Sequence, residues 1–186
     1  MFLRILTTFC LTVTMLTATA QQRHGDGIDD VLQYTPYATV FILKAAGVDS
    51  RHEWPQLVAT AAASWVASAG VAYVLKHSIK EWRPDHSDQR SFPSGHATFA
   101  FAGATALHKE FGHLSPWVSV GGYTVAVLTA ADRVRRDRHH WYDVCAGAAI
   151  GFAVTEAAYM ISEKVFPKKD VAVAFTGNSL SLAYRW

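Results

Sequence analysis

Apolar stretches alternate with short polar segments along the chain, in the pattern of a helical protein. Apolar residues recur at helical spacing in five stretches, and proline or glycine marks several of their ends. Residues 56–75 carry no charge over a length that can cross a bilayer. The pattern predicts an all-α antiparallel helical bundle embedded in a membrane. Its helices are expected at about 31–46 (interrupted by Pro36), 55–77, 94–111, 116–132 and 139–165.

The two ends of the chain differ from this helical part. Arg4, an apolar run at 5–16 and the small residues Ala18 and Ala20 are typical of a secretory signal peptide. A retained first membrane helix is the alternative. At the other end, the residues at 171–186 predict a short C-terminal β-hairpin around a polar turn. We therefore divide the chain into a signal peptide (1–20), a helical domain (21–170) and a hairpin tail (171–186).

Composition narrows the class of protein but not its function. Hydrophobic residues make up 51% of the chain and charged residues only 17%, which suits one domain that is either a compact helical protein or a modest membrane protein. The formal net charge of +2 identifies no class of partner, and we expect no nucleic-acid partner. The positions of the charges along the chain are more informative than their sum.

Basic, histidine and acidic residues gather at the ends of the predicted helices. Consecutive helices joined by short loops run antiparallel, so the loop after the second helix and the loop after the fourth lie at the same end of the bundle. His139 and Asp143 are four residues apart and are expected on one helical face. We expect one cluster at this end, formed by Lys76, Arg83, Ser94, Gly95, His96, Arg133, His139 and Asp143.

This set of residue types points to phosphate chemistry. Guanidinium groups suit bidentate contacts with phosphate, and lysine supplies a further positive charge. The start of the third helix adds free backbone N–H groups at Ser94 and Gly95. Two histidines beside such an anion suggest covalent phosphoryl transfer, in which one attacks phosphorus and the other protonates the leaving oxygen.

Three segments also resemble, in the same order, the tripartite signature of the type 2 phosphatidic acid phosphatase (PAP2) superfamily. The motif K-x6-R-P is matched from Lys76 to Pro84, P-S-G-H from Pro93 to His96, and S-R-x5-H-x3-D from Arg133 to Asp143. The resemblance covers about 71–151. Asp132 stands where the pattern has serine, and this departure bears on substrate preference.

The resemblance implies a phosphatase that needs no metal or other cofactor. It implies that His139 is the nucleophile, that Asp143 orients it, and that His96 is the general acid for the leaving group. It also implies a set of phosphate-binding residues, namely Lys76, Arg83, Ser94, Gly95 and Arg133.

Other functions compete with this one. A zinc hydrolase could use ligands from among His96, His139, His140 and Asp143, although the nearby cations would repel a metal ion. A scaffold without turnover and a vanadium haloperoxidase are further alternatives. The loop arginines, at 135, 136 and 138, either contact an anionic head group or are a solvated basic loop.

The compact, exported form is similar to the bacterial lipid phosphatases of the superfamily, which implies a lipid phosphate and the bilayer as partners. Lipid A is the expected substrate, with its 4′-phosphate as one target. Undecaprenyl diphosphate, phosphatidylglycerol phosphate and the soluble periplasmic acid phosphatases are the alternatives. Counting helices from a cleaved signal places the active site on the periplasmic face of the inner membrane. The sequence leaves the oligomeric state open.

Overall fold

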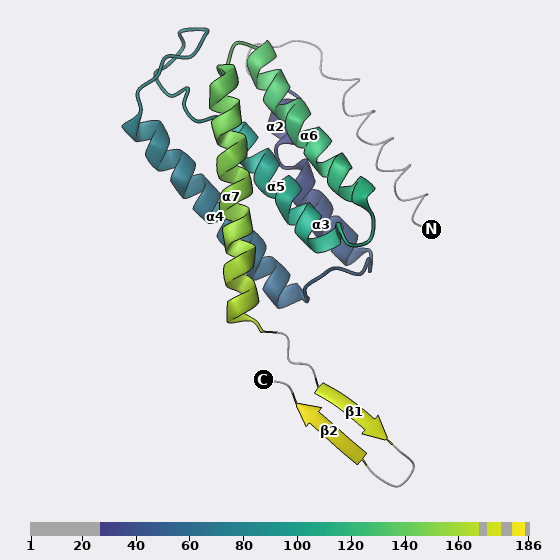
Figure 1. The fold of residues 1–186 in the computed structure, drawn as a ribbon. Helices are drawn as coiled ribbons and strands as arrows, with labels where there is room; N and C mark the ends of the chain where they lie inside the picture. The colour runs from purple at the N-terminus through teal and green to yellow at the C-terminus, as the bar shows by residue number, and fades with distance from the viewer. Residues whose placement is uncertain (1–26, 168–170, 176–179, 185–186) are drawn as a thin grey trace.

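The computed structural model describes residues 27–167, 171–175 and 180–184. Within the first of these ranges six helices form a bundle (Figure 1). The expected signal peptide lies outside the described residues. The helices are α2 (Asp29–Leu32), α3 (Thr35–Ala45), α4 (Trp54–Ser78), α5 (Gly95–Phe111), α6 (Pro116–Arg135) and α7 (Trp141–Val165).

Helix α5 is the central element of the bundle, packed against α7, α6, α3 and α4. Its alanines at 100, 102, 104 and 106 are fully buried although they point in different directions around the helix. Small side chains on every side let four neighbouring helices approach its axis. The prediction of an all-helical bundle is confirmed.

Two glycines bring α7 against α5. An added Cβ at Gly147 would lie 2.4 Å from the carbonyl oxygen of Ser94, and one at Gly151 would lie 2.2 Å from that of Thr98. No side chain fits at these distances, so the two backbones touch directly. Because Gly147 lies one turn after Asp143, this contact sets the distance between the start of α7 and the start of α5.

The boundaries of three helices differ from the expected ones, and one of these helices, α6, continues to Arg135, three residues beyond its expected end. The first predicted helix is divided into α2 and α3, and Pro36 lies in the first turn of α3, where proline is tolerated. The last helix begins at Trp141, and His140 is its N-cap. His139 therefore precedes the helix, and the expectation that His139 and Asp143 share a helical face was wrong.

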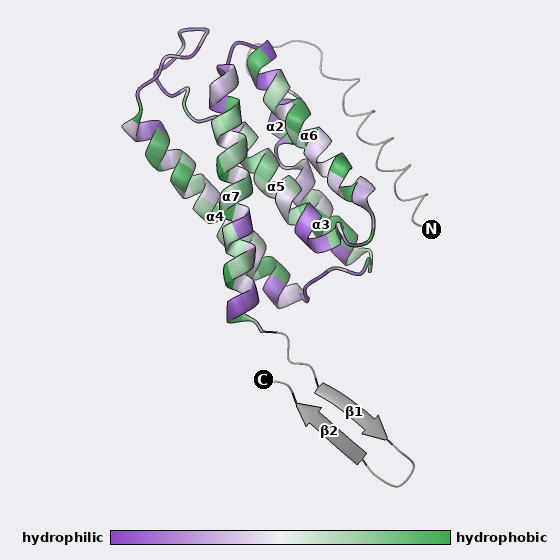
Figure 2. Cartoon of the chain, in the orientation of Figure 1, coloured by the Kyte–Doolittle hydropathy of each residue, from purple (hydrophilic) through white to green (hydrophobic). Residues whose placement is uncertain are grey.

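Large apolar side chains remain exposed along the outer helices. Figure 2 shows hydrophobic residues along α4 and α7 and hydrophilic residues in the loop between α4 and α5. Both helices are long and apolar enough to cross a membrane, and only 33% and 28% of their most apolar stretches are buried. A core helix of a water-soluble protein would be mostly buried, so the length, composition and exposure of these two helices agree with the predicted membrane bundle.

Two short strands follow the helices. Strand β1 (Val171–Phe175) pairs antiparallel with β2 (Leu180–Tyr184), from Val171 opposite Tyr184 to Phe175 opposite Leu180.

Candidate active site

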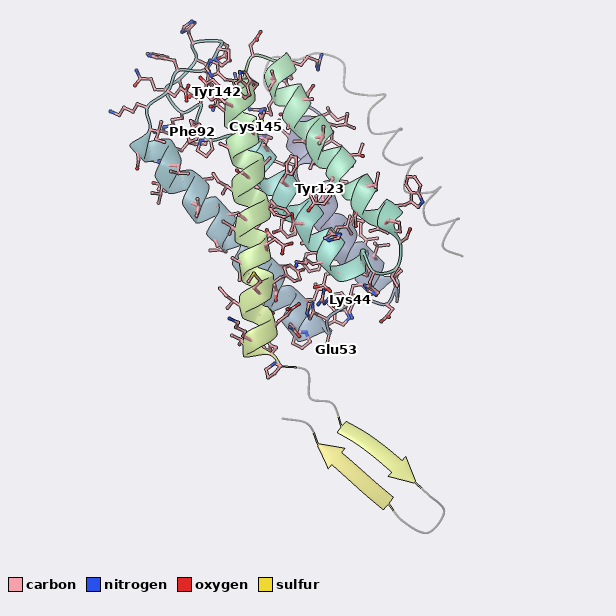
Figure 3. All side chains as sticks on the ribbon, viewed as in Figure 1. Lys44, Glu53, Phe92, Tyr123, Tyr142 and Cys145 are labelled. Atoms are coloured by element: carbon pink, nitrogen blue, oxygen red, sulfur yellow. The ribbon has the colours of Figure 1, made fainter. Side chains whose placement is uncertain are left out.

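The predicted site residues lie at one end of the bundle, where the loop between α4 and α5 meets the loop between α6 and α7. Figure 3 shows many polar side chains at this end, where Phe92 and Tyr142 are labelled, while Lys44 and Glu53 mark the opposite end. The two loops are joined by hydrogen bonds from the Asp85 amide to the Asp137 carbonyl (3.2 Å) and from the Arg83 guanidinium to the Arg138 carbonyl (3.0 Å).

The His139 ring lies between a carboxylate and a guanidinium. Its Nδ1 is 3.6 Å from Oδ2 of Asp143, and its Nε2 is 3.4 Å from a terminal nitrogen of Arg83. Arginine only donates hydrogen bonds, so in the neutral ring Nε2 is the acceptor and Nδ1 carries the proton. The ring therefore presents a nitrogen lone pair on the side of the cation, and its N–H faces Asp143.

Asp143 is held in place by several donors. Its side chain accepts hydrogen bonds from the Ser91 hydroxyl and from the His140 amide, the latter at 2.9 Å. Its carbonyl oxygen accepts from the Ser94 amide at 3.0 Å, which ties the start of α7 to the start of α5. The carboxylate is fully buried, so its direction relative to His139 is fixed.

Two cations come from the first motif. Arg83 donates from Nε to Oδ1 of Asp88 at 2.9 Å, and its terminal nitrogen reaches His139. Lys76 donates to the carbonyl oxygens of Arg90 (2.9 Å) and Pro93 (2.8 Å). These contacts place both positive charges beside the loop that leads into α5.

The third cation, Arg133, is almost fully buried at the end of α6. One terminal nitrogen of its guanidinium donates to Oδ2 of Asp29, from the short helix α2. Its Nε is buried and has no hydrogen-bond partner among the described residues. A buried, unpaired guanidinium N–H is unfavourable and calls for an acceptor.

The start of α5 brings in the second motif. Ser94 is the N-cap of the helix, and its hydroxyl accepts a hydrogen bond from the Ala97 amide at 3.4 Å. An added Cβ at Gly95 would meet no heavy atom within 4 Å, so the backbone there borders open space. His96 donates from Nε2 to Oδ1 of Asp30 at 2.7 Å.

Asp132, the departure from the motif, pairs with its neighbours. Its carboxylate lies 2.6 Å from a terminal nitrogen of Arg135 and 3.9 Å from one of Arg136. Arg136 also contacts Asp29 at 2.9 Å, and Arg138 contacts Asp85 at 2.8 Å. All three arginines are therefore ion-paired, Arg135 from the last turn of α6 and Arg136 and Arg138 from the loop that follows.

The electrostatic setting favours a neutral His139. Burial lowers the pKa of this histidine, and the charges of Lys76, Arg83 and Arg133 lower it further, while the Asp143 carboxylate, 3.6 Å from its Nδ1, acts in the opposite direction. The result is a pKa of about 4, against an ordinary value of 6.5. The ring is then unprotonated at neutral pH, as a nucleophile must be.

Two groups of side chains have a spacing that a metal ion could use. They are Asp29, Asp30 and His96, and Glu81, His140 and Asp143. In each group the carboxylates already accept hydrogen bonds, although Oδ1 of the buried Asp143 has no partner among the described residues. Asp29 contacts Arg133 and Arg136, and Asp143 accepts from Ser91 and the His140 amide. A cation bound to the hydrogen-bonded oxygens would have to displace these donors.

Comparison with known proteins assigns the family. Residues 53–167, well over half of the chain, match the PAP2 superfamily, and the chain belongs to it. Among curated proteins it is similar to a lipid A 1-phosphatase of Porphyromonas gingivalis, with 39% identity over 140 residues, which is 75% of this chain and 32% of that protein. It is also similar to a probable diacylglycerol pyrophosphate phosphatase of Schizosaccharomyces pombe, 35% identical over 92 residues, or 44% of this chain and 32% of that one.

A solved structure supports the fold. The crystal structure of LpxE from Aquifex aeolicus matches with a TM-score of 0.53 and 21% identity, over 80% of this chain and 94% of that one. The chain spans about a third of the length of the curated relatives named above. The family match ends at residue 167, before the two strands, so the comparisons give the expected hairpin no support.

All eight predicted site residues lie at this end of the bundle, but the sequence reading missed the groups behind them. Asp29 and Asp30 contact Arg133 and His96, and Asp88 contacts Arg83. No motif marks these acids. The adjacent acids Asp29 and Asp30, directly before the helix expected at about 31–46, were the available signal.

Proposed function

We propose that this protein is a phosphatase that removes a phosphate group from a membrane lipid through a phosphohistidine on His139. The observation that carries the proposal is the position of that ring, with its N–H toward Asp143 and its free nitrogen toward Arg83. Such a nitrogen is unprotonated, oriented, and beside the charge that would hold a phosphate.

In the first step Nε2 of His139 attacks phosphorus, and the bond from phosphorus to the lipid oxygen breaks. The proton on Nδ1 stays with the ring, and Asp143 stabilises the positive charge that develops there. His96 gives a proton to the leaving oxygen. In the second step a water molecule attacks the phosphohistidine, gives its proton to the now neutral His96, and releases inorganic phosphate.

The remaining site residues act on the charge of the transferring group. Arg83, Arg133 and Lys76 surround the place where phosphate would lie, and the unpaired Nε of Arg133 gains an acceptor there. The open space at Gly95 leaves room for a phosphate oxygen beside the backbone at the start of α5. With three cations in these roles, we expect the reaction to proceed without a metal ion.

A membrane location agrees with the exposed apolar faces. Helix α4 has 25 residues, which corresponds to roughly 37 Å and exceeds the ~30 Å of a bilayer core. Exposed tryptophans lie near both ends of the bundle, Trp82 and Trp141 at the catalytic end and Trp54 and Trp117 at the other. Tryptophan favours the membrane–water interface. We propose that α4 and α7 cross the inner membrane and that the site opens on its periplasmic side.

The name of the Porphyromonas relative points to lipid A, and to its 1-phosphate rather than the 4′-phosphate. We therefore propose lipid A as the substrate and the 1-phosphate as the first position to test. Undecaprenyl diphosphate and phosphatidylglycerol phosphate would present the same terminal phosphate to the same cations.

The test is phosphate release by purified protein from lipid A, undecaprenyl diphosphate, phosphatidylglycerol phosphate and p-nitrophenyl phosphate, each with and without EDTA. Mass spectrometry of the lipid A product identifies the phosphate removed. We expect release from lipid A that resists EDTA, is inhibited by vanadate, and is abolished by His139→Ala.

Three results would contradict the proposal. Loss of activity with EDTA and its return with zinc would assign a metal hydrolase. Release only from the aryl phosphate, by protein recovered in a soluble fraction, would assign a soluble acid phosphatase. Full activity of His139→Ala would remove the nucleophile.

A further inference from the structure

Helix α2 brings two carboxylates to the site from outside the family match, which begins at residue 53. Figure 1 shows α2 beside α6, at the end where the loops meet. Asp29 is fully buried, whereas the Asp30 side chain is 39% exposed. Asp29 contacts Arg133 and Arg136, and Asp30 contacts His96. Neither Asp29 nor Asp30 belongs to any of the three motifs.

The Asp30 carboxylate is itself anchored. Its Oδ2 accepts a hydrogen bond from the Gly27 amide at 3.1 Å, while its Oδ1 lies 2.7 Å from Nε2 of His96. Gly27 packs so tightly that an added Cβ would lie 1.4 Å from a terminal nitrogen of Arg136. The turn at Gly27 therefore has a single conformation, and in this conformation the Asp30 carboxylate points at the His96 ring.

The contact decides which nitrogen of His96 can act on a substrate. Nε2 is occupied by Asp30, whereas Nδ1 makes no hydrogen bond within the residues that the structure describes. A proton delivered to a leaving oxygen must therefore come from Nδ1. A carboxylate on Nε2 also favours the doubly protonated ring, which is the form that a general acid needs.

The charges around His96 act in opposite directions. Burial lowers the pKa of this histidine, and so does the positive charge of Arg133. The hydrogen bond with Asp30 and the charges of Asp29 and Asp30 raise it, although not enough to cancel the first two. Without the carboxylates of α2, the ring beside Arg133 would lose its proton at a lower pH.

An alternative is that the carboxylates occupy the place of the phosphate and inhibit the enzyme. The contact of Asp29 argues against it, because Asp29 takes one terminal nitrogen of Arg133 and leaves the buried Nε without a partner. The guanidinium is thus held by one terminal nitrogen and keeps a donor that has no partner among the described residues. Asp88 holds Nε of Arg83 and leaves its terminal nitrogen beside His139 in the same way.

We propose that Asp30 is a positioning residue for the general acid His96, whose Nε2 it holds so that Nδ1 is left to face the leaving oxygen in the first step. The proposal rests on the proposed phosphohistidine mechanism. In that step the His139–phosphorus bond forms, the bond from phosphorus to the leaving oxygen breaks, and the Nδ1 proton of His96 passes to that oxygen.

The test compares two leaving groups with Asp30→Asn, which keeps the size of the side chain and removes its charge. The value of kcat/KM reports the first step, so it is measured for dioctanoyl phosphatidic acid, whose alkoxide needs a proton to leave, and for p-nitrophenyl phosphate, whose phenolate does not. We expect kcat/KM for the phosphatidic acid to fall by roughly 10²-fold, the size of a general-acid contribution, and the aryl value to stay within about twofold. The alkaline limb of the phosphatidic acid profile should move to lower pH.

Two further variants make the result specific. In Asp30→Ala, added formate should restore part of the lost activity, because it can occupy the vacated position beside Nε2. Glu163→Gln is the control, since this exposed acid pairs with Arg51 at 3.1 Å at the opposite end of the bundle. It should match the wild type on both esters.

The outcomes are distinct. An equal fall on both esters, or no fall on either, would overturn the role of Asp30, and a gain in activity would assign Asp30 as a competitor of the phosphate instead. Activity of His139→Ala on either ester would instead refute the phosphohistidine mechanism on which the proposal rests.

Discussion

Gly147→Ala tests whether the contact between α7 and α5 positions the nucleophile. The added Cβ would lie 2.4 Å from the Ser94 carbonyl oxygen and 3.1 Å from the Thr98 hydroxyl, whereas ordinary contact begins at 3.4 Å. The nearer atom is backbone and cannot rotate away, so the two helices must separate by about 1 Å. The hydrogen bond from the Ser94 amide to the Asp143 carbonyl, now 3.0 Å, lies one turn away and would lengthen with them.

The expected effect is larger on activity than on folding. Overpacking of this kind costs about 1–3 kcal/mol of stability, which the bundle can tolerate, whereas a displacement of about 1 Å at reacting groups lowers the rate by roughly 10²-fold. Phosphate release and thermal unfolding are measured on the same preparation in detergent. We expect folded protein with kcat reduced by roughly 10²-fold.

The matched control is Gly70→Ala in α4, where an added Cβ meets no atom within 4 Å. Alanine is favoured over glycine in a helix by roughly 0.5–1 kcal/mol, so this variant should keep full activity and unfold at the same or a higher temperature. If Gly147→Ala keeps wild-type kcat, the contact does not position His139 and Asp143. If both variants lose activity together, the effect does not come from the α5–α7 contact.

Two other predictions concern the nucleophile and the groups around it. Because the pKa of His139 is lowered to about 4, the acid limb of kcat/KM should fall near pH 4 rather than near 6.5, once the profile is corrected for the second ionisation of the substrate phosphate. Protonation removes the attacking lone pair, so activity is lost as pH falls, and a limb near 6.5 would show that the ring is not desolvated as described. Ser91→Ala removes a hydrogen bond to the Asp143 carboxylate that is worth about 1.5–3 kcal/mol. We expect kcat to fall by roughly 10- to 100-fold with KM little changed. A change in KM alone would contradict this role of Ser91.

The sequence predicted the convergence of the motifs because that convergence follows from simple topology. Short loops make neighbouring helices antiparallel, so loops two helices apart lie at the same end. Lys76, Arg83 and Arg133 needed no further information to be placed together. The prediction of the cluster therefore depended on the helix count and on the loop lengths, both of which proline and glycine positions mark.

The details that the sequence predicted wrongly depend on contacts that a pattern of residues does not encode. His139 and Asp143 are separated by four residues, as in a helix, but the chain from Arg136 to His140 turns back on the end of α6 before α7 begins. Amides of Arg138 and His139 bond to the Arg133 carbonyl at 3.1 and 3.3 Å. The two side chains still meet, because the N-cap geometry at His140 leaves Asp143 in the first turn, directed back toward the preceding loop.

The motifs could not predict the acids behind the site, and the reason is a different one. Four of the proposed functional groups each contact a carboxylate: His139 has Asp143, Arg83 has Asp88, Arg133 has Asp29 and His96 has Asp30. A buried cation without a partner is strongly unfavourable, so a site built to bind phosphate needs these acids while it is empty. These acids must also leave one nitrogen of each group without a hydrogen-bond partner. Among the described residues, Nε of Arg133 and Nδ1 of His96 are such nitrogens. The motifs specify the groups that face the phosphate, while three of the four acids come from other positions, two of them on α2. Substitutions on α2 should therefore alter the protonation and the orientation of the site side chains without removing any group that touches the substrate.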